Sequence, residues 1–466
     1  MDDFTISNLV NKARAAQKQI ANYSQAEVDR MITAVAWEVY CDENIEKLAN
    51  LAVQETGMGN VKDKITKHKN KVGGVLADVI EKKSVGLIEE DKQKGIRKYA
   101  KPVGVVGALT PVTNPTATPA SNAVSILKGR NAVIFSPHPT AKNSSKLAVD
   151  MMRLGLKKVG APEDLIQIIE EPSLDYTNEL MRQVDLVVAT GGGPMVKSAY
   201  SSGTPAFGVG PGNSCQIIAE DADVKDAAKK IRGSKSFDNA TSCSSENSIV
   251  IQKDIYDDMV SALVSEGAYF VKGEERQKLK DTMWIVNRKG NLAINAKIVA
   301  RSANRIAEMA GIETPENTTM LLVEGEMPLE EDLFSDEKLS PVLTLWKYDK
   351  FSEGVEILSR LTDNAGRGHS CGIHSFNEEY INYLGENMLS SRIMVRQAQA
   401  AANGGSFTNG MPSTTTLGCG TWGNNITTEN ITYKHFLNIT WLSVPIEDHR
   451  PSDEELFGSY LKGLSE

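Results

Sequence analysis

The chain has 466 residues, 41% hydrophobic and 24% charged, a composition typical of a globular protein with two or three domains. Its formal net charge of −9 argues against an extended basic surface that would bind nucleic acid. Five widely spaced cysteines without a C-x-x-C pair argue against a disulfide framework or a metal site. The chain has no leader pattern and no apolar run near the roughly 20 residues that span a bilayer, so we expect a cytoplasmic protein that does not engage a membrane.

The first 77 residues carry apolar side chains at helical spacing, and we expect helices there. The segment 84–101 is short, charged and strand-like, which predicts a hairpin that leaves the domain body.

From residue 103 the pattern changes to short apolar runs that alternate with helical segments. The runs at 105–109, 131–135, 165–169 and 184–189 predict buried strands of a doubly wound, mostly parallel α/β sheet. Ligands bind such sheets at the carboxyl ends of the strands. These ends are marked here by Thr110, Ser136 and Thr190.

A second α/β pattern follows, with strands expected at 320–323, 341–346, 372–374 and 393–395. We therefore expect a nucleotide-binding domain over 1–235 and a catalytic domain over 236–430. Residues 431–466 would supply a C-terminal strand, near 436–444, and a polar tail.

Cys243 lies between a charged helical segment and an apolar strand, among small polar residues that run from Phe237 to Ser248. A cysteine on such a loop can be exposed enough to react, and backbone N–H groups of the loop can stabilise an oxyanion. The alternative is a buried structural thiol.

Three other strand ends carry candidate functional groups. The turn Thr190-Gly191-Gly192-Gly193 allows close backbone approach to a phosphate or nicotinamide, although a simple tight turn has the same sequence character. His138 lies between two prolines and could bind a ribose or cap its own turn. Asn114 follows a strand on a proline-stiffened loop, where its amide could stabilise an oxyanion or satisfy the turn.

The blocks around these residues resemble those of the aldehyde dehydrogenase superfamily over nearly the whole chain, specifically its CoA-acylating branch. The similar blocks are Phe237-Asp238-Asn239 with Cys243 and Glu246, Thr113-Asn114-Pro115, Phe135 to Pro139, Thr190-Gly191-Gly192, Glu337 to Pro341, and Leu417 to Gly420. The chain looks similar to the aldehyde-oxidising half of bifunctional aldehyde–alcohol dehydrogenases. It looks more similar still to acylating dehydrogenases of the sulfoacetaldehyde type.

The resemblance implies a role for each block. Cys243 would attack an aldehyde and form a thiohemiacetal, whose oxyanion Asn114 and the backbone N–H of Cys243 would hold. Hydride transfer to NAD or NADP would leave a thioester, which coenzyme A would attack as co-substrate. The cofactor would be held by Thr110, Pro111, Ser136, Pro137, His138, Thr190, Gly191, Gly192, Gly210 and Glu337.

One departure from the superfamily pattern favours the acylating reaction. Hydrolytic members carry a glutamate that activates water, whereas the corresponding stretch here, Gly208 to Asn213, contains no acid. Glu246 is a candidate replacement base, but we interpret it as structural.

Arg396 follows the expected strand at 393–395, where bifunctional relatives have an uncharged residue. It would favour a sulfonated or carboxylated aldehyde, with Thr113 and Thr241 as further substrate contacts, unless it only forms an ion pair. We therefore expect sulfoacetaldehyde as substrate. The alternatives are acetaldehyde or another short aldehyde, or a non-catalytic protein of the same fold.

Two questions about cofactor and assembly stay open at the level of sequence. A 2′-phosphate of NADP needs a nearby cation, for which Lys142 and Arg130 are candidates. The resemblance implies a homodimer or homotetramer assembled through the strand segments at 84–101 and 436–444.

Overall fold

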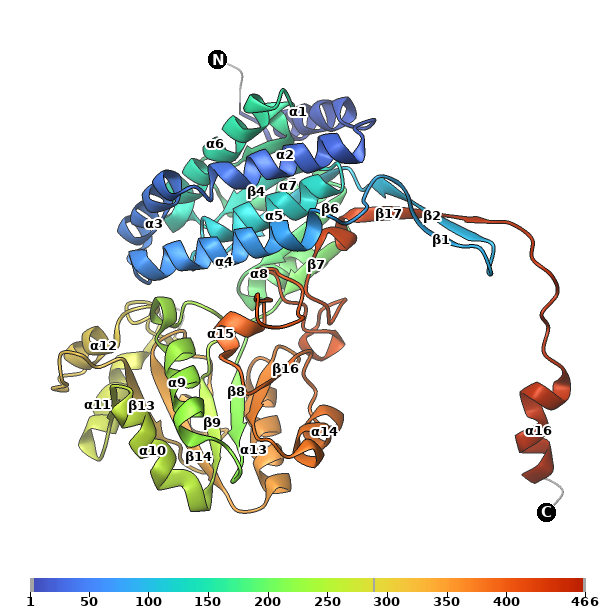
Figure 1. The fold of residues 1–466 in the computed structure, drawn as a ribbon. Helices are drawn as coiled ribbons and strands as arrows, with labels where there is room; N and C mark the ends of the chain where they lie inside the picture. The colour runs from blue at the N-terminus through green and yellow to red at the C-terminus, as the bar shows by residue number, and fades with distance from the viewer. Residues whose placement is uncertain (1–3, 288–289, 464–466) are drawn as a thin grey trace.

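The computed structural model describes residues 4–287 and 290–463. They form two α/β bodies that face each other, and an arm of strands leaves the first body (Figure 1). In this part of the chain no helix is both long and apolar enough to cross a membrane. The chain has the α/β architecture with parallel sheets that was expected from the alternating apolar runs.

The first body contains a five-stranded parallel sheet in the order β5-β4-β3-β6-β7. Its strands are β3 (Val105–Thr110), β4 (Ala132–Pro137), β5 (Ile166–Ile168), β6 (Leu186–Thr190) and β7 (Ala206–Val209). Every residue of β3 and β4 is buried, which explains their uninterrupted apolar sequence. The strand order reverses between β3 and β6, and in such sheets the ligand crevice lies at this reversal.

Eight helices surround this sheet. They are α1 (Ile6–Gln19), α2 (Gln25–Glu38), α3 (Asp42–Thr56), α4 (Val61–Val79), α5 (Ala117–Lys128), α6 (Lys142–Lys158), α7 (Leu174–Gln183) and α8 (Gly193–Tyr200). Right-handed crossovers place α5 and α6 on one face, and α7 and α8 on the other. Helices α2 and α4 form a further layer against α5, which itself covers the sheet. Helix α4 therefore lies between α5 and the second body (Figure 1).

The second body contains a seven-stranded sheet in the order β10-β13-β14-β9-β8-β15-β16, and all of its neighbouring strands are parallel. Its strands are β8 (Cys215–Ile218), β9 (Ser248–Gln252), β10 (Ala268–Phe270), β13 (Met320–Glu324), β14 (Val342–Tyr348), β15 (Cys371–His374) and β16 (Ile393–Val395). The four strands expected in this region are all present.

Apolar clusters on both faces of this sheet hold its helices. Helices α9 (Val224–Lys235) and α10 (Tyr256–Ser265) share one cluster, and α13 (Phe351–Asn364) and α14 (Glu378–Asn387) share another. A third cluster contains α11 (Glu274–Met283), α12 (Ala303–Met309) and the hairpin of β11 (Trp284–Val286) and β12 (Leu292–Ile294). The short helix α15 (Gln399–Ala402) follows β16.

The chain enters the second sheet at β8, before the expected boundary at residue 235. Strand β8 pairs with β9 on one side and β15 on the other, so it is central to the second sheet. The short apolar run Cys215–Ile218 gives no sign in the sequence of which sheet it joins, because its partners are distant in the chain.

The arm is a three-stranded antiparallel sheet of β1 (Gly86–Asp91), β2 (Ile96–Pro102) and β17 (Leu437–Ser443). These strands correspond to the hairpin expected near 84–101 and the strand expected near 436–444. The arm projects from the first body and leads to α16 (Asp453–Gly463), as Figure 1 shows. Strand β17 pairs only with β2 among the described residues, so its other edge is open.

Candidate active site

The two sheets turn different edges toward each other. Thr110 and Thr190 lie at the carboxyl ends of their strands in the first sheet. Cys243, His369 and Arg392 instead precede β9, β15 and β16, at the amino edge of the second sheet. The candidate site therefore lies between the carboxyl edge of one sheet and the amino edge of the other.

Cys243 follows a backbone turn of unusual conformation. Asp238, Asn239 and Ala240 have φ values of 50°, 53° and 59°, in the left-handed region that residues other than glycine rarely adopt. Such strain persists only where surrounding contacts fix it, and it is concentrated at functional sites. Cys243 itself is partly exposed, so the turn presents a thiol that a substrate can reach.

The carboxylate of Asp238 fixes this turn to α4 of the first body. Its Oδ2 accepts hydrogen bonds from Lys64 Nζ at 3.1 Å, Lys67 Nζ at 2.5 Å and Thr241 Oγ1 at 2.8 Å. Its Oδ1 accepts the backbone N–H of Asn60 at 3.0 Å. Burial alone would raise the pKa of Asp238, but the two ammonium groups outweigh burial and hold that pKa below its usual range.

Lys67 also orients Asn114. Its Nζ donates to Asn114 Oδ1 at 2.7 Å and to Thr241 Oγ1 at 2.7 Å, so one ammonium group joins the loop after β3 to the loop that carries the nucleophile. Because Lys67 occupies the amide oxygen, the Nδ2 of Asn114 is the end that can donate to a substrate. This arrangement suits an oxyanion donor.

We expect Asn114→Ala to lower kcat by about 10²- to 10³-fold, as for loss of one oxyanion donor. The matched variant Asn114→Asp keeps an acceptor for Lys67 but places a negative charge against the developing oxyanion, so it should be at least as slow. Steady-state kinetics of both variants test this role. If Asn114→Ala keeps kcat within threefold of the parent, the amide does not stabilise an oxyanion.

His369 lies directly against the nucleophile, with Nε2 3.2 Å from Cys243 Sγ and Nδ1 2.8 Å from Ser370 Oγ. Burial, followed by the charge of Arg392, lowers the pKa of His369 to about 3, so the imidazole is neutral at pH 7. Burial, then Glu337 and Cys419, raises the pKa of Cys243 to about 12. At neutral pH the pair is thus a thiol beside a neutral imidazole that can accept its proton.

Arg392 holds the backbone of His369 in place. Its guanidinium is buried and donates to the carbonyl of His369 at 2.7 Å, to Asn430 Oδ1 at 2.7 Å, and to the carbonyl of Gly418. It therefore fixes His369 relative to the Leu417–Gly420 block. Within the part of the chain that the structure describes, none of its hydrogen bonds is to a carboxylate, so its positive charge adds to the field at Cys243.

The carboxyl edge of the first sheet has the features expected of a nucleotide site. Thr110 Oγ1 is buried and has no hydrogen-bond partner among the described residues, and Thr190 Oγ1 contacts Thr416 Oγ1 at 3.0 Å. Gly192 is the N-cap of α8, and a Cβ at Gly193 would meet open space. A glycine-lined helix N-terminus beside an orphaned hydroxyl fits a dinucleotide phosphate.

The remaining residues expected at the cofactor lie at or near the same interdomain region. Ser136 and Pro137 end β4 beside β3, and Pro111 directly follows β3. His138 is partly exposed, and its ring Nδ1 bonds the Thr140 hydroxyl, as a turn cap would. Gly210 lies on the segment that connects the two bodies. A Cβ atom added at Gly210 would lie 3.7 Å from the Gly423 carbonyl oxygen. Glu337 receives the backbone N–H of Gly212, and burial raises the pKa of Glu337 to about 8.

The chain is similar to known proteins over nearly its whole length. The aldehyde dehydrogenase family model matches residues 2–415. The chain belongs to the aldehyde dehydrogenase family. It is similar to a sulfoacetaldehyde dehydrogenase of an Acholeplasma species, with 65% identity over 98% of this chain and 94% of that protein. An acylating sulfoacetaldehyde dehydrogenase of Bilophila wadsworthia is 56% identical over 98% of this chain and 99% of that protein.

The fold of this aldehyde dehydrogenase also matches a solved structure. An acetylating aldehyde dehydrogenase from Geobacillus thermoglucosidasius superposes with a TM-score of 0.91 at 37% identity, over 96% of this chain and 98% of that one. The superfamily expected from the sequence is confirmed by these matches.

Arg396 is not brought to the nucleophile of this aldehyde dehydrogenase. It follows the carboxyl end of β16, donates to the Ser375 carbonyl at 2.6 Å and lies over the Phe376 ring at 4.5 Å. From His369 to Ser375 a strand spans roughly 20 Å at its usual rise. The guanidinium therefore lies at the edge of the sheet away from Cys243, and the expected anion contact there is not supported.

Thr241 and Thr113 also differ from expectation. The Thr241 hydroxyl is buried between Asp238 and Lys67, so it positions the nucleophile turn rather than contacting substrate. The backbone carbonyl oxygen of Thr113 accepts a hydrogen bond from Lys64 Nζ at 3.4 Å. Both residues lie at the site, where their hydrogen bonds hold the loops in place instead of contacting the substrate.

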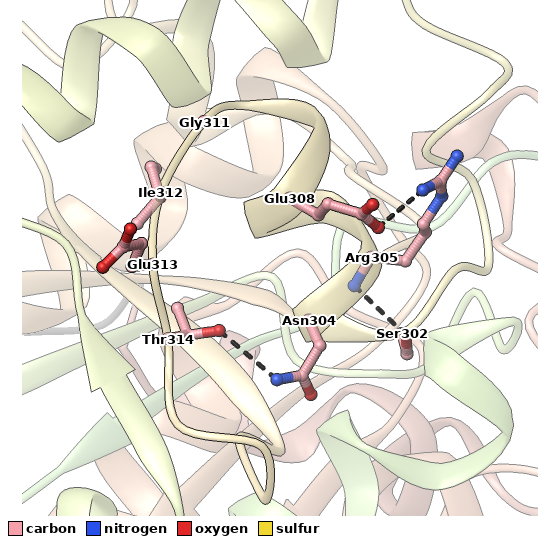
Figure 2. Close-up of a pocket in the computed structure, with 8 residues that line it drawn as sticks. All are labelled: Ser302, Asn304, Arg305, Glu308, Gly311, Ile312, Glu313 and Thr314. Atoms are coloured by element: carbon pink, nitrogen blue, oxygen red, sulfur yellow. Dashed lines mark hydrogen bonds and ion pairs between the residues drawn. The ribbon is translucent and has the colours of Figure 1, made fainter.

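The pocket drawn in Figure 2 lies elsewhere, on α12 and the loop after it. Its polar groups pair with one another: Arg305 with Glu308, Ser302 Oγ with the Arg305 backbone, and Asn304 with Thr314. It is lined by no cysteine or histidine, and no group of three or more potential metal ligands occurs among the described residues.

Proposed function

We propose that this aldehyde dehydrogenase oxidises sulfoacetaldehyde to its CoA thioester with NAD or NADP as hydride acceptor. The observation that carries the proposal is the contact of Cys243 Sγ with His369 Nε2 at 3.2 Å, on a loop that Lys67 joins to Asn114. The high identity to sulfoacetaldehyde dehydrogenases supports the choice of aldehyde.

The first step is addition of the thiol to the aldehyde. Neutral His369 takes the Sγ proton as Cys243 attacks the carbonyl carbon, which forms a thiohemiacetal. Asn114 Nδ2 and the backbone N–H of Cys243 donate to the carbonyl oxygen as its negative charge develops. Lys67 keeps Asn114 in the donating orientation through its bond to Oδ1.

The bound nicotinamide would accept a hydride and leave a thioester on Cys243. Thr110, Thr190, Gly191 and Gly192 would hold the dinucleotide at the carboxyl edge of the first sheet, and Glu337 its nicotinamide ribose. Of the two cations considered for a 2′-phosphate, Arg130 precedes β4 at the opposite edge and bonds the carbonyls of Ala21 and Ala100. Lys142 begins α6 near the carboxyl edge and pairs with Glu171, so it is the candidate for NADP.

Release of the acyl group to CoA is favoured because the stretch Gly208 to Asn213, where hydrolytic relatives carry the glutamate that activates water, contains no acid. Glu246, the candidate base beside Cys243, is fully buried and its Oε1 accepts from Gln216 Nε2 at 2.8 Å and the backbone N–H of Gln399 at 3.1 Å. It therefore joins the loop to β8 and α15. Once the first proton has left His369 for solvent, His369 can take the CoA thiol proton as that sulfur attacks the thioester, and return it to Cys243 Sγ as the bond from the acyl carbon to Cys243 breaks.

The test is reduction of NAD and NADP by the purified protein with sulfoacetaldehyde, acetaldehyde and succinic semialdehyde, each with and without CoA. We expect CoA-dependent turnover with the highest kcat/KM for sulfoacetaldehyde. Equal turnover without CoA would contradict the acylating reaction, and a preference for acetaldehyde would contradict the substrate. Absence of turnover with any aldehyde would favour a non-catalytic protein of this fold.

We also propose that the arm joins copies of this chain into a homodimer or homotetramer. The open edge of β17 offers unpaired backbone groups, and Trp441, Leu442 and Val444 on or beside it expose 62%, 37% and 42% of their surface. An exposed apolar strand edge of this kind pairs readily with another strand.

We expect Trp441→Glu to shift the protein to a smaller species in size-exclusion chromatography with light scattering. The control is Leu174→Glu, which changes an 82% exposed leucine at the start of α7 and should leave the mass unchanged. A parent protein that is already monomeric at micromolar concentration would contradict assembly through the arm.

A further inference from the structure

Helix α5, which follows Asn114, carries buried polar side chains that the reaction above does not use. The backbone N–H of Thr118 donates to the Asn114 carbonyl at 3.3 Å, so helical spacing continues from the oxyanion donor. Residues 118, 121 and 122 share one face of α5, which begins about one turn beyond Asn114. Thr118, Ser121 and Asn122 are at most 4% exposed.

Three polar atoms on this face have no partner among the residues that the structure describes: Thr118 Oγ1, Ser121 Oγ and Asn122 Nδ2. Asn122 Oδ1 is bonded by Thr416 Oγ1 at 3.4 Å, which leaves the NH₂ end as the free donor. An unsatisfied buried polar group is costly, and three on one helical face require an explanation. A bound ligand that accepts hydrogen bonds would supply one.

Helix α4 runs alongside α5 and places the ammonium group of Lys71 beside the turn of α5 that contains Thr118. Lys64 bonds the Thr113 carbonyl, His68 bonds Thr116, and the Lys128 ammonium reaches the carbonyl of Ile80, so both helices run in the same direction. Lys67 meets Asn114. Lys71 is one turn beyond Lys67, as Thr118 is one turn beyond Asn114.

Lys71 differs from its neighbours on α4 in having no carboxylate partner among the described residues. Lys64 and Lys67 share Asp238, whereas Lys71 Nζ donates only to the carbonyls of Gly404 and Gly405, at 2.9 and 3.2 Å. An ammonium group has three N–H donors, so one is left. The charge of Lys71 also interacts with Cys243, which places it near the nucleophile.

We propose that Lys71 and Thr118, with Ser121 beyond them, bind the sulfonate of the substrate while Asn114 holds the aldehyde oxygen; this assignment rests on the proposed function. A two-carbon sulfonated aldehyde separates its two polar ends by roughly 4 Å, from bond lengths near 1.5 Å. That is close to the 5.4 Å of one helical turn. A sulfonate presents three oxygen acceptors and one negative charge, which match hydroxyl donors and an unpaired ammonium group.

The test compares kcat/KM for sulfoacetaldehyde and for propionaldehyde, a neutral aldehyde of similar size, in the presence of CoA. We expect Lys71→Met to lower the ratio of the two values about 30-fold or more, and the near-isosteric Thr118→Val about tenfold. Both changes should act mainly through KM for sulfoacetaldehyde, because the sulfonate takes no part in bond making.

Two matched variants control for charge and for loss of a buried hydroxyl. Lys69→Met removes a lysine that pairs with Asp42 and lies over the Tyr40 ring, away from the site. Ser125→Ala removes a buried hydroxyl one turn beyond Ser121. Both should leave the ratio within about twofold of the parent.

The outcomes distinguish an error in the proposed substrate from an error in the proposed sulfonate site. A parent that turns over neutral aldehydes but not sulfoacetaldehyde contradicts the proposed substrate. A parent that prefers sulfoacetaldehyde, with both aldehydes slowed equally in Thr118→Val and Lys71→Met, overturns the sulfonate site alone. Thr118→Val decides the matter if Lys71→Met does not fold.

Discussion

Replacement of Cys243 by alanine is expected to lower kcat by about 10⁴-fold or more, to the limit of detection. Without the sulfur no thiohemiacetal or thioester forms, so every later step is lost together. The change removes a partly exposed side chain, and the fold should be retained. Nucleotide reduction under saturating aldehyde and CoA measures the effect.

Cys41 offers the matched control for this experiment. It is the other partly exposed cysteine among the described residues, and it lies at the N-cap of α3 without a side-chain capping bond. Cys41→Ala should keep kcat within twofold of the parent. Turnover by Cys243→Ala within tenfold of the parent would show that the chemistry does not pass through this thiol.

Replacement of His369 by alanine is expected to have the next largest effect and to change the pH profile. With the pKa of Cys243 raised to about 12, only about one thiol in 10⁵ ionises spontaneously at pH 7. Because the pKa of His369 is far below that of the thiol, the imidazole does not ionise resting Cys243 and accepts its proton only as the C–S bond forms. Loss of this assistance should lower kcat about 10²- to 10⁴-fold.

The direction of the pH effect follows from the two pKa values. His369, with its pKa lowered to about 3, stays neutral and able to accept a proton at any pH above that value. Neither His369 nor Cys243 changes its protonation state between pH 6 and 8, so the kcat of the parent should vary little over this range. In His369→Ala the rate should rise about tenfold per pH unit, because the thiolate fraction rises in this way below the pKa of the thiol.

His374 provides the comparison for His369. It is also buried, at the opposite end of β15, and burial lowers the pKa of His374 to about 4. His374→Ala should keep the parent pH profile even if stability falls. A flat profile in His369→Ala, or a loss of activity equal to that of His374→Ala, would contradict the role of His369 as base.

The sequence was sufficient to predict most strands and the architecture. Strands such as β3 and β4 are buried on both faces, so their apolar runs are continuous and easily recognised. The nucleophile loop and Asn114 were recognised through their family blocks. Which sheet β8 joins was not predictable, because strand pairing depends on partners far along the chain.

The sequence did not identify the groups that act on Cys243 through space. His369, Lys67 and Lys71 lie on other elements, and no local spacing relates them to the cysteine. The role expected for Arg396 rested on its charge at a position after a strand where bifunctional relatives have an uncharged residue. The structure places that position at the carboxyl edge of the second sheet, whereas the second sheet presents its amino edge to the site, where Arg392 lies instead.

The most direct test of the central claim is the mass of the protein after reaction without CoA. The parent is incubated with sulfoacetaldehyde and the preferred nicotinamide, analysed by intact-mass spectrometry, and then given CoA. We predict a sulfoacetyl adduct on Cys243 that persists without CoA, disappears when CoA is added, and yields one sulfoacetyl-CoA per adduct. Steady release of the free acid without CoA, or CoA thioester formation without any adduct in Cys243→Ala, would contradict acyl transfer through this cysteine.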